Sequence, residues 1–267
     1  MNVRTFPNSL RPGVGLPPRR ESQRPLLPQH ARHCPVLEAG STLGYLIYPP
    51  LEPFESFYVG FYGEGRYQFI YYFQTEQGQW SPIFLVRLAL PAGGLGRAMQ
   101  EVEFKLKDVR MSRDEALLLM RKFIVPEDLG TPPGAVTLRG ATNFRTPEGW
   151  DTVYTPVLNS IERPSPPMLV VRVETDWYLH ESEFRYVLQP GEGISCQRTL
   201  PIGQVFFVPR DEITLTESTG EELDAMRRAD DEFSRGKAAD EVTTPYGVPY
   251  SPHYLKTSRA RQKDREG

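Results

Sequence analysis

The chain lacks the features that define several large classes of protein. None of its apolar runs is long enough to span a bilayer. The N-terminus has arginines but no apolar core region, so it does not read as a secretory signal. Cys34 and Cys196 are the two cysteines, which allow one disulfide at most. We therefore expect two reduced thiols and a cytoplasmic protein.

An excess of charge of one sign is also missing. Lysine and arginine number 31 against 34 acidic residues, and the formal net charge is -3. So small a net charge gives no strong field that would select nucleic acid or a membrane surface, and we expect neither partner. Two catalytic signatures are absent as well: the loop Pro91–Gly96 is not followed by Gly-Lys-Ser/Thr, and no Gly-x-Ser-x-Gly elbow occurs. Whether the protein is an enzyme stays open.

Proline and glycine, in contrast, are abundant at 26 and 22 residues. Between Gly134 and Arg210 they separate short runs that are rich in β-branched and aromatic residues, which is the pattern of strands. The spacing leaves no room for crossover helices, so the strands should be antiparallel. The runs expected as strands are Ala135–Arg139, Thr152–Leu158, Met168–Val173, Phe184–Leu188 and Gln204–Val208. Met168–Val173 is almost continuously apolar, which predicts a strand buried on both faces.

The region before Gly134 predicts a further sheet. Its strands are expected at Gly44–Pro49, Phe57–Tyr62, Tyr67–Phe73 and Glu101–Lys107, with a hairpin turn at Gly63–Gly65. The dense aromatic residues of this region favour a core layer with an outer amphipathic face. A platform on which a ligand stacks is the alternative.

Two capping boxes predict helices. Ser112-x-x-Glu115 begins one inside the globular part, and Ser218-x-x-Glu221 begins another over Glu221–Arg235 that stops at Gly236. The predicted fold is mainly β: an antiparallel two-sheet β-sandwich or β-clip with one internal helix and a C-terminal helix. We expect a flexible basic Pro/Arg-rich leader over 1–33, the β domain over 34–215, and the helix with an extended basic tail over 216–267.

Several motifs resemble known families. RTPEGW (Arg145–Trp150), VETDW (Val173–Trp177) and the Cys34-Pro35 start followed by Gly44–Tyr45 resemble a bacterial family known only as a domain of unknown function. The resemblance covers most of the chain outside the tails and implies no activity.

A second resemblance concerns the fold. The order of a PEGW turn, VETDW, a PGE turn and LPIGQVFFVP (Leu200–Pro209) is similar to the β-clip proteins of the dUTPase and dCTP deaminase type. The likeness implies that Glu174 lies where that family has its catalytic aspartate. The chain departs from the family at Tyr154–Ser160, which reads YTPVLNS and lacks the Arg-Ser-Ser-like phosphate loop. The resemblance therefore implies the architecture and not nucleotide hydrolysis.

One dense group of titratable residues lies beside strong strand signals. Strand alternation places Glu174 and Asp176 on one face, where paired carboxylates can share a proton or hold a divalent cation. Next to a buried Trp177, such a carboxylate would have a raised pKa and act as a base. The alternative is a polar strand end with Asp176 capping a turn and the later carboxylates in solvent. The predicted catalytic set is Glu174, Asp176 and Glu183, with His180 as an auxiliary.

Ligand-binding residues are expected around a pocket lined by Trp150, Trp177 and Tyr186, together with Arg145. The sequence His30-x-x-His33-Cys34 has ingredients of a zinc site, but no fourth ligand is visible, so no metal site is predicted and any cofactor stays unknown.

These observations predict a β-rich binding or assembly protein without a recognisable catalytic motif. Its partner would be a second copy or another protein held through the C-terminal arm, and a small-molecule ligand is compatible with it. The alternative is a carboxylate-dependent hydrolase, metal-assisted or not, that acts on a small molecule or a nucleotide.

Overall fold

The computed structural model describes residues 2–20, 34–90, 100–107, 111–160, 166–243, 245, 247 and 249–266. The chain divides into two compact units, Met1–Asp211 and Glu212–Gly267. The division falls after Asp211, whereas the sequence predicts a boundary after residue 215.

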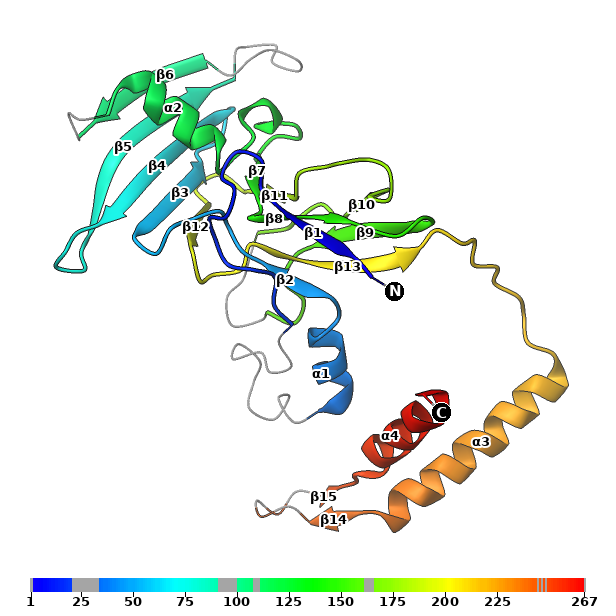
Figure 1. Cartoon of the computed structure of the whole chain (residues 1–267). Coiled ribbons are helices and arrows are strands. Elements are labelled where there is room, and N and C mark those ends of the chain that lie inside the picture. Colours follow the sequence, from blue (N-terminus) through cyan, green and yellow to red (C-terminus); the bar gives the residue numbers. More distant parts are fainter. Residues whose placement is uncertain are drawn as a thin grey trace. The chain divides into compact units, whose positions relative to one another are not determined.

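The first unit is built from antiparallel sheets, as predicted (Figure 1). Its largest sheet has five strands in the order β12-β3-β4-β5-β6. The strands are β3 (Glu55–Phe61), β4 (Arg66–Gln74), β5 (Trp80–Ala89), β6 (Gln100–Leu106) and β12 (Gly193–Gln197). The predicted hairpin between β3 and β4 is confirmed, since Gly63, Glu64 and Gly65 all have positive φ.

A four-stranded sheet and two ribbons complete the strands of this unit. The sheet has the order β10-β9-β13-β2, and the ribbons pair β11 with β7 and β1 with β8, all antiparallel. The strands are β1 (Arg4–Pro7), β2 (Tyr45–Ile47), β7 (Ala135–Arg139), β8 (Thr142–Arg145), β9 (Trp150–Thr155), β10 (Val171–Val173), β11 (Glu183–Val187) and β13 (Gly203–Pro209). The fold is thus mainly β and consistent with a sandwich.

An aromatic layer lies between the five-stranded sheet and helix α2 (Arg113–Arg121). Figure 1 shows α2 across one face of that sheet. The ring of Phe123, just after the helix, stacks on Phe57 at 5.2 Å and on Tyr71 at 5.9 Å between ring centroids. Ser112 caps α2 through the predicted capping box. The interpretation of these aromatic residues as a core layer is confirmed, because Phe57, Tyr71 and Phe123 are buried.

The expectation of a flexible leader is wrong for residues 2–20. β1 pairs with β8, and the buried Asn8 donates from Nδ2 to the Gly140 carbonyl oxygen at 2.9 Å. Arg11 donates to both carboxylate oxygens of the buried Glu55, at 2.5 and 3.1 Å. These partners lie far away in the sequence, so local composition does not reveal them. His30 and His33 lie outside the described residues.

The predicted strand Met168–Val173 is also wrong in part. Only Val171–Val173 forms a strand, β10, and it lies at the edge of its sheet, paired with β9 alone. Val170 is 63% exposed. The edge position agrees with the preceding prolines, which lack the amide hydrogen that a central strand needs. The run Gln204–Val208 does lie in a strand, β13, but Phe206 to Val208 are only half-buried.

Two short helical segments of this unit were not expected from the sequence. They are α1 (Pro35–Ser41), which begins at a proline, and the 3-10 turn Pro126–Asp128.

The second unit is a helix, a small hairpin and a second helix: α3 (Gly220–Ala239), β14 (Val242–Thr243), β15 (Pro249–Tyr250) and α4 (His253–Glu266). The capping box is one residue later than predicted and joins Thr219 with Glu222. Gly236 lies inside α3 and does not end it. Its lack of a side chain leaves room for the His253 ring, which lies 2.4 Å from the place of an added Cβ. The prediction of an extended tail is wrong, since α4 occupies it. None of the helices among the described residues is long and apolar enough to cross a bilayer.

Gly44 provides a test of the packing between β2 and β13. Its φ of +72° disfavours any side chain, and an added Cβ would overlap the Val205 carbonyl oxygen. Gly44→Ala should lower the free energy of unfolding by about 2–5 kcal/mol, from backbone strain and overpacking together. The matched control is Gly191→Ala, with φ of +90° and open space around its Cβ, which should cost about 1–2 kcal/mol. Urea unfolding measures both, and equal losses would contradict the proposed clash.

Candidate functional site

The predicted carboxylates Glu174 and Asp176 lie in the turn after β10, in a network centred on Arg210. Arg210 Nη2 donates to Asp176 Oδ1 at 2.7 Å and to Asp151 Oδ1 at 2.6 Å. Arg172 Nε donates to the other Asp151 oxygen at 2.6 Å. The Glu174 carboxylate lies 3.8 Å from Arg210 Nη1. Each of these carboxylates therefore faces an arginine.

The arginines keep the two aspartates charged. The hydrogen bond from Arg210 lowers the pKa of Asp176, and the bond from the Gly149 amide to Asp176 Oδ2 at 2.9 Å acts in the same direction. Burial alone would raise the pKa of Asp151, but the hydrogen bonds from Arg210 and Arg172 outweigh burial and lower it. The hydrogen bonds to Asp151 and Asp176 raise the pKa of Arg210. Carboxylates held in this way are poor general bases at neutral pH.

Buried hydroxyl groups support the turn that carries this network. Thr175 Oγ1 lies 2.9 Å from Thr146 Oγ1 and 2.7 Å from Thr152 Oγ1. Together with the Gly149–Asp176 bond, these contacts tie the turn after β10 to the turn before β9. The alternative in which Asp176 caps a turn thus agrees with the geometry.

His180 and Glu183 belong to a different group. Arg139 Nη1 donates to Glu183 Oε1 at 2.9 Å, and His180 Nε2 lies 3.8 Å from Glu183 Oε2. Burial raises the pKa of Glu183 and lowers the pKa of His180. The Tyr178 ring stacks on His180 at 5.6 Å. The Tyr178 amide donates to the Glu174 carbonyl oxygen at 3.0 Å, but no side-chain hydrogen bond or ion pair of the described residues joins His180 or Glu183 to Glu174 or Asp176. The predicted catalytic set is therefore split in two.

The structure does not bring the four predicted ligand-binding residues together. Tyr186 is a core residue whose hydroxyl donates to the Ile202 carbonyl oxygen at 2.7 Å. Trp177 was expected to be buried, but it is 65% exposed. Trp150 begins β9 and is half-buried. Arg145 is exposed at the end of β8, directly opposite Arg4 of β1.

Metal-binding side chains do not gather either. Within the part of the chain that the structure describes, no three His, Cys, Asp or Glu side chains are grouped so that they could hold a metal ion.

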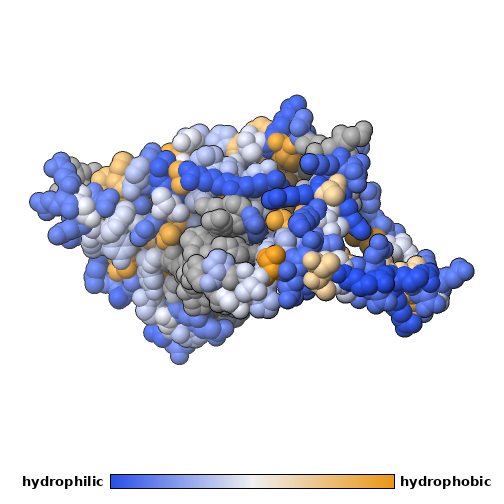
Figure 2. Space-filling model, turned by 90° about the horizontal axis from the view of Figure 1, so that it is seen from below, coloured by the Kyte–Doolittle hydropathy of each residue, from blue (hydrophilic) through white to orange (hydrophobic). Residues whose placement is uncertain are grey.

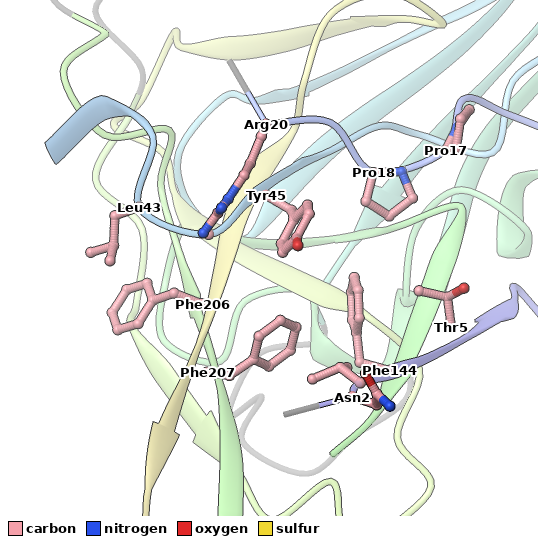
Figure 3. A pocket seen from close by; sticks show the side chains of 12 residues that line it. Asn2, Thr5, Pro17, Pro18, Arg20, Leu43, Tyr45, Phe144, Phe206 and Phe207 are labelled. Carbon is pink, nitrogen blue, oxygen red and sulfur yellow. The ribbon is translucent and has the colours of Figure 1, made fainter. Parts of the chain in front are cut away.

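Apolar side chains do not form a broad surface patch on the face that Figure 2 shows, where they occur in small groups among hydrophilic residues. Several apolar side chains line a pocket in the first unit, which has a volume of about 720 Å³. We call it the aromatic pocket (Figure 3). It is lined by Asn2, Val3, Thr5, Pro17, Pro18, Arg20, Leu43, Gly44, Tyr45, Phe144, Phe206 and Phe207.

Three rings form the centre of the aromatic pocket. Phe207 lies 6.2 Å from Tyr45 and 5.6 Å from Phe144 between ring centroids, and the second pair meets edge to face. The rings come from β13, β2 and β8. Gly44 allows this arrangement because it lets the start of β2 approach β13 closely.

Arg20 lies at the edge of the pocket, and its position is set by the backbone. Arg19 and Leu46 exchange two backbone hydrogen bonds, at 3.2 and 2.8 Å, which join this segment to β2. Gly15 brings the same segment so close to the fold that an added Cβ would lie 2.5 Å from the Ala141 Cβ. The guanidinium carbon of Arg20 is 5.4 Å from the centroid of the Tyr45 ring.

Sequence reasoning missed this pocket for two reasons. Phe206 and Phe207 lie in the apolar run Gln204–Val208 and were expected to be core, and Arg20 was assigned to a flexible leader. The sequence held one local signal. Adjacent side chains of a strand point to opposite faces, so Phe206 and Phe207 cannot both face the same side of the sheet.

Comparison of the sequence with protein-family models finds no match, and comparison with curated proteins finds none either. The interpretation of the site therefore depends on its geometry.

The Arg210 network should make stability depend on pH. Asp151 and Asp176 have lowered pKa values in the folded state. Their contribution to the free energy of unfolding is therefore present above the ordinary carboxyl pKa of about 3.9, and it is lost as the pH falls through the lowered pKa values. Arg210→Gln should lower the urea midpoint at pH 7 and reduce the further loss between about pH 5 and pH 2.

Arg66→Gln is the matched control for this experiment, because Arg66 pairs with the exposed Glu64. It should leave both the midpoint and its pH dependence nearly unchanged. If Arg210→Gln kept the acid sensitivity of the unchanged protein, the network would not be its source.

Proposed function

We propose that this protein is a non-catalytic binding and assembly protein whose second unit pairs with the same unit of another copy. One observation carries the proposal: α3 has no buried residue, although it presents an apolar stripe along one side. Leu223 is 44% exposed and Met226 is 64% exposed. A helix that leaves its apolar side in water gains little from folding, so a partner that covers the stripe would stabilise it.

Helix α4 covers only the C-terminal part of α3. The His253 ring lies 5.0 Å from the Phe233 ring, and its Nδ1 is 2.8 Å from Asp240 Oδ2. Lys256 Nζ donates to Asp240 Oδ1 at 2.9 Å. These contacts involve the last two turns of α3 and leave Leu223 and Met226 uncovered.

Charge favours a second copy as the partner. Helix α3 carries six acidic and four basic residues, whereas α4 carries five basic and two acidic ones. In a two-fold dimer, the α3 of one copy can face the α4 of the other, and each contact then occurs twice. Burial of a Leu or Met side chain contributes about 1.5–3 kcal/mol, so a doubled pair of them contributes about 6–12 kcal/mol. This gain offsets much of the cost of association, which is about 4–15 kcal/mol.

The carboxylate-dependent hydrolase receives less support. Asp176 and Asp151 are engaged by Arg210, and Glu183 is engaged by Arg139, so a free general base is not provided by these groups. The resemblances to an uncharacterised bacterial family and to β-clip nucleotide enzymes add no activity to the proposal. A cytoplasmic location belongs to the proposal as well, because the chain has only two cysteines.

A pair of substitutions tests the assembly. Leu223→Gln with Met226→Gln keeps good helix formers in α3 but removes the apolar stripe. The molar mass in solution, measured by light scattering over a range of concentrations, should fall from that of a dimer to that of a monomer. The dimer should weaken by at least tenfold, which corresponds to about 1.4 kcal/mol.

The matched control changes Arg228→Gln and Glu232→Gln, which lie on the other side of α3 and leave the net charge unchanged. This variant should remain a dimer, and a chain that ends at Asp211 should be a monomer. A monomeric full chain, or a dimer that survives removal of residues 212–267, would refute the proposal.

A further inference from the structure

We propose that the aromatic pocket binds a small organic anion with a flat aromatic body, and that Arg20 receives the anionic group. A sulfonate, carboxylate or phosphate on an aromatic ring has this chemistry. The inference concerns the first unit and is independent of the assembly proposed for the second.

The pocket has the size and walls that such a ligand needs. Small-molecule sites commonly measure about 300–1,000 Å³, and this pocket measures about 720 Å³. Figure 3 shows the rings of Tyr45, Phe144 and Phe207 around the same space. Aromatic walls stack on planar ligands or meet their edges, and they bury apolar area at the same time.

The charge at the pocket specifies an anion. Arg20 is the one charged residue among its described lining residues. Arg11, Arg139 and Arg210 each pair with a carboxylate, whereas Arg20 makes no ion pair with any described residue. Its guanidinium presents a planar set of donors that matches a carboxylate, sulfonate or phosphate.

Arg20 needs little reorganisation to bind. The backbone bonds between Arg19 and Leu46 fix the preceding residue, and the Tyr45 ring lies beneath the guanidinium. A cation held over an aromatic face loses less freedom when it binds a ligand than a free arginine would lose.

The other side of the pocket is polar. Figure 3 shows Asn2 and Thr5 away from Arg20, beyond the three rings. Their amide and hydroxyl groups can form hydrogen bonds with a polar substituent at the far end of the ligand. The arrangement therefore fits a ligand with an anionic end, a flat apolar middle and a weakly polar far end.

Two probes of the same shape separate the contributions of charge and of the aromatic walls. Naphthalene-1-sulfonate carries the anion, and naphthalene-1-sulfonamide presents the same rings without the charge. Isothermal titration of the full chain should show the sulfonate binding at least tenfold more tightly. Arg20→Gln should weaken sulfonate binding by roughly tenfold to a hundredfold, as expected for a hydrogen-bonded ion pair, and should change sulfonamide binding by less than about twofold.

Arg19→Gln is the matched control, because Arg19 is exposed, adjacent in the sequence and absent from the pocket lining. It should leave the binding of both probes unchanged. Thr5→Trp, which fills the pocket from an exposed strand position, should weaken both probes by tenfold or more. Thermal melting verifies that each variant is folded.

Four outcomes would overturn the inference. They are no sulfonate binding at millimolar concentration, equal loss in Arg19→Gln and Arg20→Gln, equal affinity for the two probes, and full binding in Thr5→Trp. The second would mean a general charge effect, the third a neutral apolar ligand, and the fourth a site elsewhere on the chain.

Discussion

The buried ion pair between Arg11 and Glu55 holds together the part of the fold on which the aromatic pocket depends. Glu55 is nearly inaccessible and accepts hydrogen bonds from Arg11, from the Tyr71 hydroxyl at 2.7 Å and from the Glu52 amide at 2.8 Å. Burial raises the pKa of Tyr71, so its hydroxyl stays a donor. Half of the pocket wall comes from residues 2–20, which this pair fastens to the five-stranded sheet. Loss of either partner would leave a charge in the core and free that wall.

Charged groups serve two purposes in the first unit. Most of the arginines that meet carboxylates stabilise turns and edges: Arg210 joins the turn after β10 to the start of β9, and Arg139 joins β7 to β11. Groups that are satisfied in this way have little left to offer a ligand. Arg20 differs because, within the described part of the chain, its charge meets the face of Tyr45 and no carboxylate. The ligand proposal therefore rests on Arg20 and the pocket that it borders, and not on the titratable residues around Arg210.

The sequence predicts well the features that depend on residues close together along the chain. The capping box at Ser112, the hairpin at Gly63–Gly65 and the aromatic layer around Phe57 follow from patterns a few residues long, and all three are present. The errors arise where partners are distant. Asn8 bonds to Gly140, and Asp176 bonds to Arg210, so neither the ordered N-terminal segment nor the pairing of the carboxylates with arginine could be inferred from local composition. The pocket combines both difficulties, since its walls come from five separate segments.

The ribbon of β1 and β8 sets Arg4 directly opposite Arg145, and neither makes an ion pair with a described residue. Like charges in that position repel, and dissolved ions screen the repulsion over about 10 Å at 0.1 M. The same ions compete with a ligand for Arg20. Added salt therefore has two opposed effects on this protein. It reduces the repulsion in the ribbon of β1, the strand that carries Thr5, and it weakens the attraction between Arg20 and an anionic ligand. Occupancy should be greatest at an intermediate salt concentration rather than in the most dilute buffer.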